Sequence, residues 1–196
     1  MAFFEEELLE PLARELRFTK GLSAITKHKP LRILDLGCGP KIRFFHAAKK
    51  RGLRIKYYLG IDPLVSKKAK QKNSPVAIIK TPLAKTIPLP NNSLDLITGF
   101  AFLEHIDHPQ EILNEAIRVL ARKGKIVLTT PTPRAKTILE FLSYKLRIIA
   151  RREIEEHKNY FTKENLLSLI HEPKQVEIRH QYFEFGCNNL LVIKKI

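Results

Sequence analysis

Short apolar runs alternate with amphipathic segments through the first two thirds of the chain. The apolar runs predict strands at residues 31–36, 56–61, 76–79, 94–100 and 125–130. Between them, residues 41–51 and 109–121 carry apolar side chains at helical spacing, and a Lys-rich segment near 64–72 predicts another helix. Strands that alternate with helices form a parallel sheet with right-handed crossovers. Because the strands are almost continuously apolar, we expect helices on both faces of this α/β sheet.

The N-terminal segment predicts a helix that precedes the first strand. Residues 3–17 carry apolar side chains at helical spacing, at Phe4, Leu8, Leu9, Leu12 and Leu16. Three glutamates at positions 5–7 lie in its expected first turn, where they favour the positive end of the helix dipole.

The pattern changes near the C-terminus. Residues 135–150 predict a helix, and Thr162 is expected to cap a short helix that ends near Ile170. Two final strands are expected at 175–185 and 190–196. Because the link between them is too short for a crossover helix, the pair must be an antiparallel hairpin.

Composition limits the class of protein. The chain has 196 residues, 44% of them hydrophobic, which suits one well-buried domain. No apolar run approaches the roughly 20 residues of a membrane-spanning helix, and the acidic start does not resemble a signal peptide. The only cysteines, Cys38 and Cys187, lie far apart. Their number excludes a disulfide scaffold and a cysteine zinc site, so we expect free thiols and a cytoplasmic location.

The charge balance points to several kinds of partner. Lysine and arginine number 35 against 20 acidic residues, a formal net charge of +15. Such a charge suits a polyanion such as RNA, an anionic membrane surface or an acidic substrate. A solvated, Lys-rich surface explains it equally well.

A glycine turn between the first strand and the first helix of the sheet is the main chemical signal. Asp35, Gly37 and Gly39 follow the apolar run directly. Glycines let a ligand approach the backbone, and the following helix presents free N–H groups. Asp62 lies 27 residues after Asp35, at the end of the second strand. A carboxylate at this place can accept hydrogen bonds from both hydroxyls of a ribose. Neither the dinucleotide fingerprint nor a Walker phosphate loop is present.

Taken together, the motifs in residues 31–131 resemble a class I S-adenosylmethionine-dependent methyltransferase, of the subgroup usually called methyltransferase type 11. The segments that carry the resemblance are Asp35-Leu-Gly-Cys-Gly-Pro40, Gly60-Ile-Asp62, Leu89-Pro-Asn-Asn-Ser-Leu-Asp95, Leu103-Glu-His-Ile106, Glu115-Ala-Ile-Arg-Val-Leu120 and Gly124-Lys-Ile-Val-Leu-Thr-Thr-Pro131. The resemblance implies a Rossmann-like, mostly parallel sheet of seven strands in the order 3-2-1-4-5-7-6, with an antiparallel last strand.

The resemblance also divides the chain into functional parts. We expect an N-terminal helical cap at 1–30, a cofactor-binding core at 31–131, a helical insert on the substrate side at 132–162, and the last helix and strand pair at 163–196. All four form a single methyltransferase domain.

Site residues follow from the same resemblance. The residues expected to contact S-adenosylmethionine, and its product S-adenosylhomocysteine, are Asp35, Gly37, Cys38, Gly39, Asp62, Pro63, Leu83, Ala84 and Phe100. Asp35 and the glycines would hold the methionine part, Asp62 the ribose, and Phe100 would border the methyl group. Two positions depart from the family pattern: Lys41 replaces the third glycine, and Pro82 replaces an acidic residue that binds adenine.

The sequence leaves the acceptor open. We expect a small-molecule, lipid-like or glycan acceptor, with His105 or His157 removing a proton where the acceptor is a hydroxyl; no metal site is expected. The basic surface favours RNA methylation as an alternative. Lys41 and Pro82 favour a degenerate protein that binds cofactor or partners without catalysis. Basic and apolar residues in 142–152 are also compatible with peripheral contact to an anionic membrane.

Overall fold

A seven-stranded sheet forms the centre of the molecule in the computed structural model, which describes residues 10–26, 29–65, 75–81, 86–144 and 158–196. The strands are β1 (Leu31–Leu36), β2 (Ile55–Ile61), β3 (Val76–Ile79), β4 (Leu94–Phe100), β5 (Leu120–Pro131), β6 (Val176–Phe183) and β7 (Asn188–Lys195). Their order is β3-β2-β1-β4-β5-β7-β6, and only β7 runs antiparallel to its neighbours. This confirms the predicted topology. The order reverses between β1 and β4, which is where open α/β sheets bind ligands.

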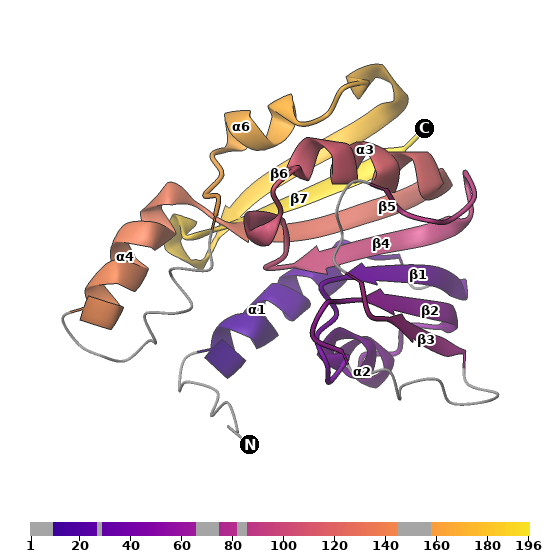
Figure 1. Cartoon of the computed structure of the whole chain (residues 1–196), viewed down its shortest axis with the longest axis horizontal. Coiled ribbons are helices and arrows are strands. Elements are labelled where there is room, and N and C mark those ends of the chain that lie inside the picture. Colours follow the sequence, from indigo (N-terminus) through magenta and orange to yellow (C-terminus); the bar gives the residue numbers. More distant parts are fainter. Residues whose placement is uncertain (1–9, 27–28, 66–74, 82–85, 145–157) are drawn as a thin grey trace.

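Helices cover both faces of the sheet (Figure 1). On one face lie α1 (Glu10–Ser23) and α2 (Arg43–Lys50); on the other lie α3 (Pro109–Val119) and α6 (Lys163–Ser168). The helix α4 (Pro133–Tyr144) follows β5 and extends beyond the carboxyl end of that strand. The described residues also form three short 3-10 turns: η1 (Leu103–His105), η2 (Pro173–Gln175) and η3 (Glu184–Gly186).

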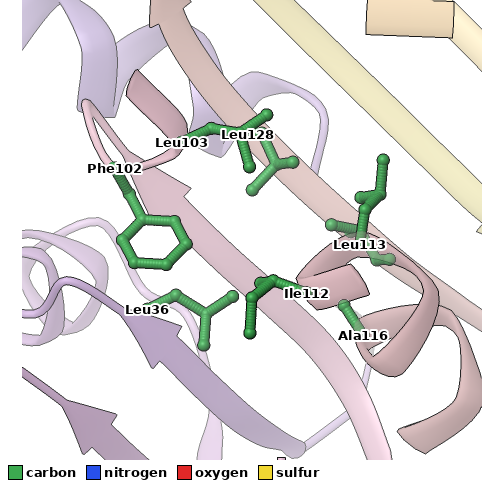
Figure 2. A pocket seen from close by; sticks show the side chains of 8 residues that line it. Leu36, Phe102, Leu103, Ile112, Leu113, Ala116 and Leu128 are labelled. Carbon is green, nitrogen blue, oxygen red and sulfur yellow. The ribbon is translucent and has the colours of Figure 1, made fainter. Parts of the chain in front are cut away.

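Two apolar layers hold these helices to the sheet. Alternate residues of β1 serve both: Ile33 packs with α1 and α2, whereas Leu34 and Leu36 pack on the α3 side. The layer under α3 leaves one small gap, lined entirely by apolar side chains (Figure 2). Its volume is only about 10 Å³, at the lower limit for a single water molecule. It is a packing gap and offers no polar group to a ligand.

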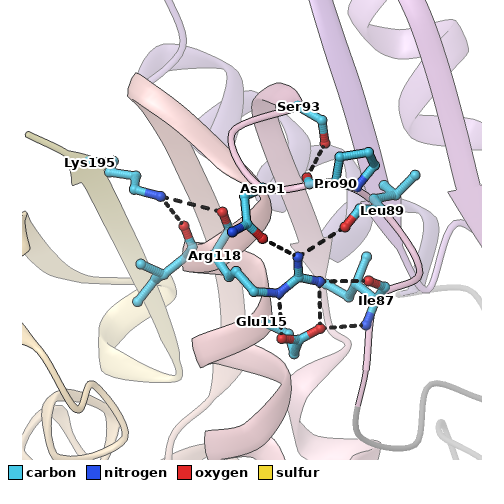
Figure 3. A network of polar contacts seen from close by, with 9 residues as sticks. Ile87, Leu89, Pro90, Asn91, Ser93, Glu115, Arg118 and Lys195 are labelled. Carbon is cyan, nitrogen blue, oxygen red and sulfur yellow. Dashed lines mark hydrogen bonds and ion pairs between the residues drawn. The ribbon is translucent and has the colours of Figure 1, made fainter.

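A polar network fixes the loop that leads into β4 (Figure 3). The guanidinium of Arg118 donates to the carbonyl oxygens of Ile87 and Leu89 and to the side chain of Asn91. Glu115 accepts from Arg118 and from the backbone N–H of Ile87. Because β4 starts here, this network lies at the amino edge of the sheet, opposite the glycine turn.

The buried side of α1 differs from the apolar stripe in the sequence. Leu12 and Leu16 are 60% and 45% exposed, whereas Phe18 and Leu22 are buried. Only the C-terminal half of this helix packs on the sheet, because Phe18 and Leu22 reach the α2 layer there. Helical spacing predicts the helix, but it does not determine which stripe meets the core.

Several element ends also differ from the sequence prediction. The strand predicted at 125–130 begins at Leu120, because the register of β4 and β5 shifts between Leu94 and Leu96 and Lys123 takes a positive φ of 63°. The helix predicted from position 41 begins at Arg43, after Ile42 in the left-handed region.

At the C-terminus the hairpin is confirmed, but its link lies earlier than predicted. Asn188 and Asn189 pair with β5 instead of turning, and η3 makes the connection. Thr162 caps α6 as predicted, accepting from the backbone N–H of Asn165 at 3.2 Å. That helix ends at Ser168, before the predicted end.

Some expectations lie outside the described residues. They are residues 3–9 of the N-terminal helix, most of the helix near 64–72, the residues Pro82, Leu83, Ala84 and His157, and residues 145–152.

Candidate functional site

The glycine turn at the end of β1 has the backbone that the motif requires. Gly37 and Gly39 have φ values of 71° and 65°, in the region that favours glycine. A Cβ on Gly37 would come within 2.9 Å of the Phe102 ring, whereas a Cβ on Gly39 would meet nothing within 4 Å. The turn is therefore packed below Gly37 and open above Gly39. Lys41 is exposed, so its side chain does not crowd the turn.

Asp62 connects the end of β2 to this turn. Its carboxylate accepts from the backbone N–H of Gly39 at 2.9 Å and from that of Leu64 at 2.7 Å. The first bond fixes the turn, and the second forms the tight bend that starts at Asp62-Pro63. A backbone bond from Gly37 to Ile61, at 2.9 Å, joins the same two strand ends. The two acidic signals of the sequence thus belong to one structural unit.

Asp35 lies buried inside the sheet beneath the turn. The hydroxyls of Tyr58 and Thr98 each donate to one of its carboxylate oxygens. Burial raises the pKa of Asp35 to about 6; the two hydroxyls oppose that shift, and the charge of Asp62 adds to it. Each oxygen retains a further lone pair, so these bonds position the carboxylate without exhausting its capacity to accept.

Two neighbouring residues pack around the turn. Cys38 is buried against Gly60, where a Cβ would lie 2.6 Å from its sulfur. Burial and the nearby acids raise the pKa of this thiol, so it stays protonated and is no nucleophile. The ring of Phe100 packs against Phe18 and Phe44, with centroid distances of 5.1 and 4.8 Å. Its predicted place beside the methyl group stays a prediction.

Three residues of this site were not found from the sequence. Tyr58 and Thr98 orient Asp35, and Phe102 packs against Gly37 and Gly99. Thr98 carried a partial signal, since it is a polar residue in an apolar strand, but its pairing with Asp35 appears only in the folded sheet. Tyr58 and Phe102 carried none, because apolar strands and loops commonly contain aromatic residues.

The loop after β4 contains the first of the two predicted histidines. His105 is half-buried in η1, and its backbone N–H donates to Phe102 at 3.1 Å. The adjacent Glu104 is completely buried. Its backbone carbonyl accepts from Lys158 and Asn159, so the chain that follows the insert packs against this loop.

The turn fits S-adenosylmethionine. The open space above Gly39 gives a ligand access to the backbone, and α2 begins just beyond it. The predicted roles of Asp35 toward the methionine part and of Asp62 toward the ribose stay predictions. Within the described parts of the chain, no cluster of His, Cys, Asp or Glu is arranged to hold a metal ion. None of the helices there is both long and apolar enough to span a bilayer.

Solved structures share this fold at low sequence identity. An S-adenosylmethionine-dependent methyltransferase from Mesorhizobium loti is 16% identical with a TM-score of 0.66, covering 90% of this chain and 96% of its own. The YcgJ protein from Bacillus subtilis is 15% identical with a TM-score of 0.66, covering 92% and 98%. A structure of the Haloferax volcanii Trm112 methyltransferase activator with its methyltransferase matches at 11% identity and a TM-score of 0.72, covering 93% and 91%. No curated protein matches the sequence.

Strand order and glycine turn together define a class I methyltransferase fold. A family model described as a methyltransferase domain matches residues 4–172. The chain belongs to this family and is a methyltransferase whose cofactor is S-adenosylmethionine.

Proposed function

We propose that this methyltransferase acts on a small-molecule, lipid-like or glycan acceptor. The observation that supports a compact acceptor is a groove of about 610 Å³ between α1 and η3. Both elements lie at the carboxyl edge of the sheet, near the ends of β4 and β5. That volume suits a small ligand or one segment of a larger one.

The reaction would be an in-line displacement at the methyl carbon. An O, N or C atom of the acceptor attacks, and charge disperses in the transition state. Much of the acceleration can then come from holding both reactants in line, without a strong acid or base. Asp35, Asp62 and the glycine turn would supply the fixed cofactor geometry for this alignment.

His105 and His157 are proposed bases for a hydroxyl acceptor. A histidine suits this role because its ordinary pKa lies close to neutrality. Replacement of each by alanine should then lower kcat without weakening cofactor binding. Unchanged turnover in both variants would eliminate the role.

Cofactor affinity is the first test of the proposed site. We expect the protein to bind S-adenosylmethionine and S-adenosylhomocysteine in the micromolar range by isothermal titration calorimetry. Asp62→Ala should weaken both by at least tenfold, because it removes the ribose acceptor and the bond that fixes Gly39. The control is Asp107→Ala, which removes an exposed carboxylate on the same side of the fold. Equal affinity of Asp62→Ala and wild type would refute the assignment.

RNA remains the second candidate acceptor. The net charge of +15 supports it through the attraction of phosphates. Its distinguishing property is a steep dependence of binding on salt concentration.

A further inference from the structure

An acidic cluster is buried at the carboxyl edge of the sheet, at the ends of β4 and β5. Glu104 in η1 is fully buried, and among the described residues neither of its carboxylate oxygens has a hydrogen-bond partner. The Thr130 hydroxyl is equally unpartnered; it lies close enough to lower the pKa of Glu104 but does not reach hydrogen-bond geometry. A buried carboxylate left without donors is costly, so this site is suited to a ligand that brings them.

The charged groups around Glu104 come from two further elements. From α1, Arg17 donates to Glu10 at 2.7 Å, and its Nε remains unpartnered. From η3, Glu184 accepts from Asn188 with one oxygen, while the other is buried and unpartnered. Burial raises the pKa of Glu104 to about 7; its own backbone N–H and Arg17 oppose that shift, and Glu10 adds to it. Three acids face one arginine, inside a protein whose net charge is +15.

The groove between α1 and η3 shares one residue, Glu184, with this cluster. Its lining residues are Leu16, Thr19, Lys20, Ser23, Phe183, Glu184 and Phe185. Glu184 therefore belongs to both the groove and the cluster. The Phe185 ring is 94% exposed and its backbone has a positive φ of 54°. An exposed apolar ring and a strained backbone each cost free energy. Together they indicate that Phe185 has a binding role.

We propose that the groove and the cluster together bind the methyl acceptor, and that this acceptor is an amine on an apolar body. The ring or chain lies along Leu16, Phe183 and Phe185, and the ammonium group faces Glu104 and Glu184. The inference rests on the proposed function and specifies its acceptor. The acidic end disfavours phosphates and carboxylates because like charges repel. Lys20, which also lines the groove, is the cation that such an anion would meet instead, so the matched carboxylate is part of the test.

Glu104 is the proton acceptor in this arrangement. The ammonium N–H gives its proton to the Glu104 carboxylate, which leaves a lone pair on nitrogen. That lone pair forms the N–C bond to the methyl carbon, while the electron pair of the broken S–C bond remains on sulfur. The proton leaves Glu104 for solvent when the product departs, and the carboxylate is restored.

The test is binding to protein saturated with S-adenosylhomocysteine, in which no turnover occurs. The probes are 2-phenylethylamine and hexylamine, with 2-phenylethanol and phenylacetate as matched compounds of the other charge types. We expect saturable binding of at least one amine, at least tenfold tighter than the alcohol, and none of the carboxylate. Glu104→Gln should weaken amine binding at least tenfold. Glu111→Gln removes the same charge from the surface of α3 and should not change amine binding.

Each alternative outcome is distinct. If the wild-type protein does not bind S-adenosylhomocysteine, the proposed function itself is refuted. Normal cofactor binding with no amine bound, or an amine bound equally well by Glu104→Gln, would overturn the acceptor proposal alone. Tighter binding of the carboxylate would reassign the groove to an acidic acceptor.

A measurement on the wild type does not depend on how the variants fold. Carbon-13 NMR of labelled glutamate follows the titration of Glu104 directly. A bound ammonium favours the carboxylate, so saturating amine should move the midpoint to lower pH by at least one unit, which is tenfold in affinity. An unmoved midpoint in the presence of bound amine would show that the ligand lies elsewhere.

Discussion

At the scale of single residues, the surroundings of each buried carboxylate decide its charge. Asp95 faces Arg32, whose Nε lies 2.9 Å from one of its oxygens, and Lys29 reaches the other at 3.3 Å. Although burial opposes the shift, these partners lower the pKa of Asp95 to about 2. Glu104 is completely buried, and burial raises its pKa to about 7 because its surroundings compensate less than those of Asp95. One carboxylate therefore stabilises the fold, whereas the other stores free energy that a ligand can recover.

Replacing Asp95 with asparagine should destabilise the protein in a pH-dependent way. A lowered pKa in the folded state means that the stabilisation is complete above the unfolded pKa near 4 and disappears as the pH falls towards 2. At pH 7 we expect Asp95→Asn to lower the free energy of unfolding by about 2 kcal/mol. Urea unfolding at pH 7 and near pH 3 measures the difference. It should shrink at the lower pH; a constant difference would contradict an ionic cause.

The sequence located the residues of the turn better than their partners. Asp35, Asp62 and the two glycines are close in short motifs, so local spacing identified them. Tyr58 and Thr98 become partners of Asp35 only when separate strands pair in one register. Such pairing depends on the whole sheet, and no local pattern contains it.

At the scale of elements, hydrophobic pattern predicted strands and helices because each must bury a face. It failed where backbone geometry intervened, as at the bulge near Gly124, where a Cβ would lie 2.7 Å from the Ala121 carbonyl oxygen. It also failed for α1, whose Leu12 and Leu16 are exposed. Because α1 packs on the sheet along only half of its length, its sequence contains apolar residues that are not buried in the core.

The loop before β4 depends on one side chain of α3. Arg118 supplies donors to two loop carbonyls and to Asn91 (Figure 3). Arg118→Ala would remove the guanidinium donors from these acceptors and from Glu115, which would keep only the backbone N–H of Ile87. We therefore expect the free energy of unfolding to fall by about 1–3 kcal/mol. Thermal unfolding measures this loss. The control is Arg122→Ala, which removes an exposed arginine and should leave stability nearly unchanged. Cofactor affinity should stay within about twofold, since the network lies at the opposite edge of the sheet; a larger loss would show that the loop shapes the site.

At the scale of the whole molecule, the surface and the inferred acceptor site carry opposite charge. The chain has a formal net charge of +15, yet Glu104 and Glu184 both lie near Glu10, the first residue of α1. A basic surface attracts polyanions without contacting base edges, and that attraction is lost as counterions are added. The surface charge therefore predicts RNA binding at low salt without making RNA the acceptor.

This separation predicts how RNA should behave. We expect bulk tRNA to bind at low salt, and its affinity to fall about 1,000-fold between 50 and 200 mM NaCl if some six phosphates are contacted. Binding of 2-phenylethylamine should be weakened far less by the same salt, because its charge is buried against Glu104. Fluorescence anisotropy of labelled tRNA and calorimetry of the amine measure the two slopes. Transfer of a radiolabelled methyl group to the tRNA, persisting at 200 mM NaCl, would instead make RNA the substrate and leave the acidic cluster to another ligand.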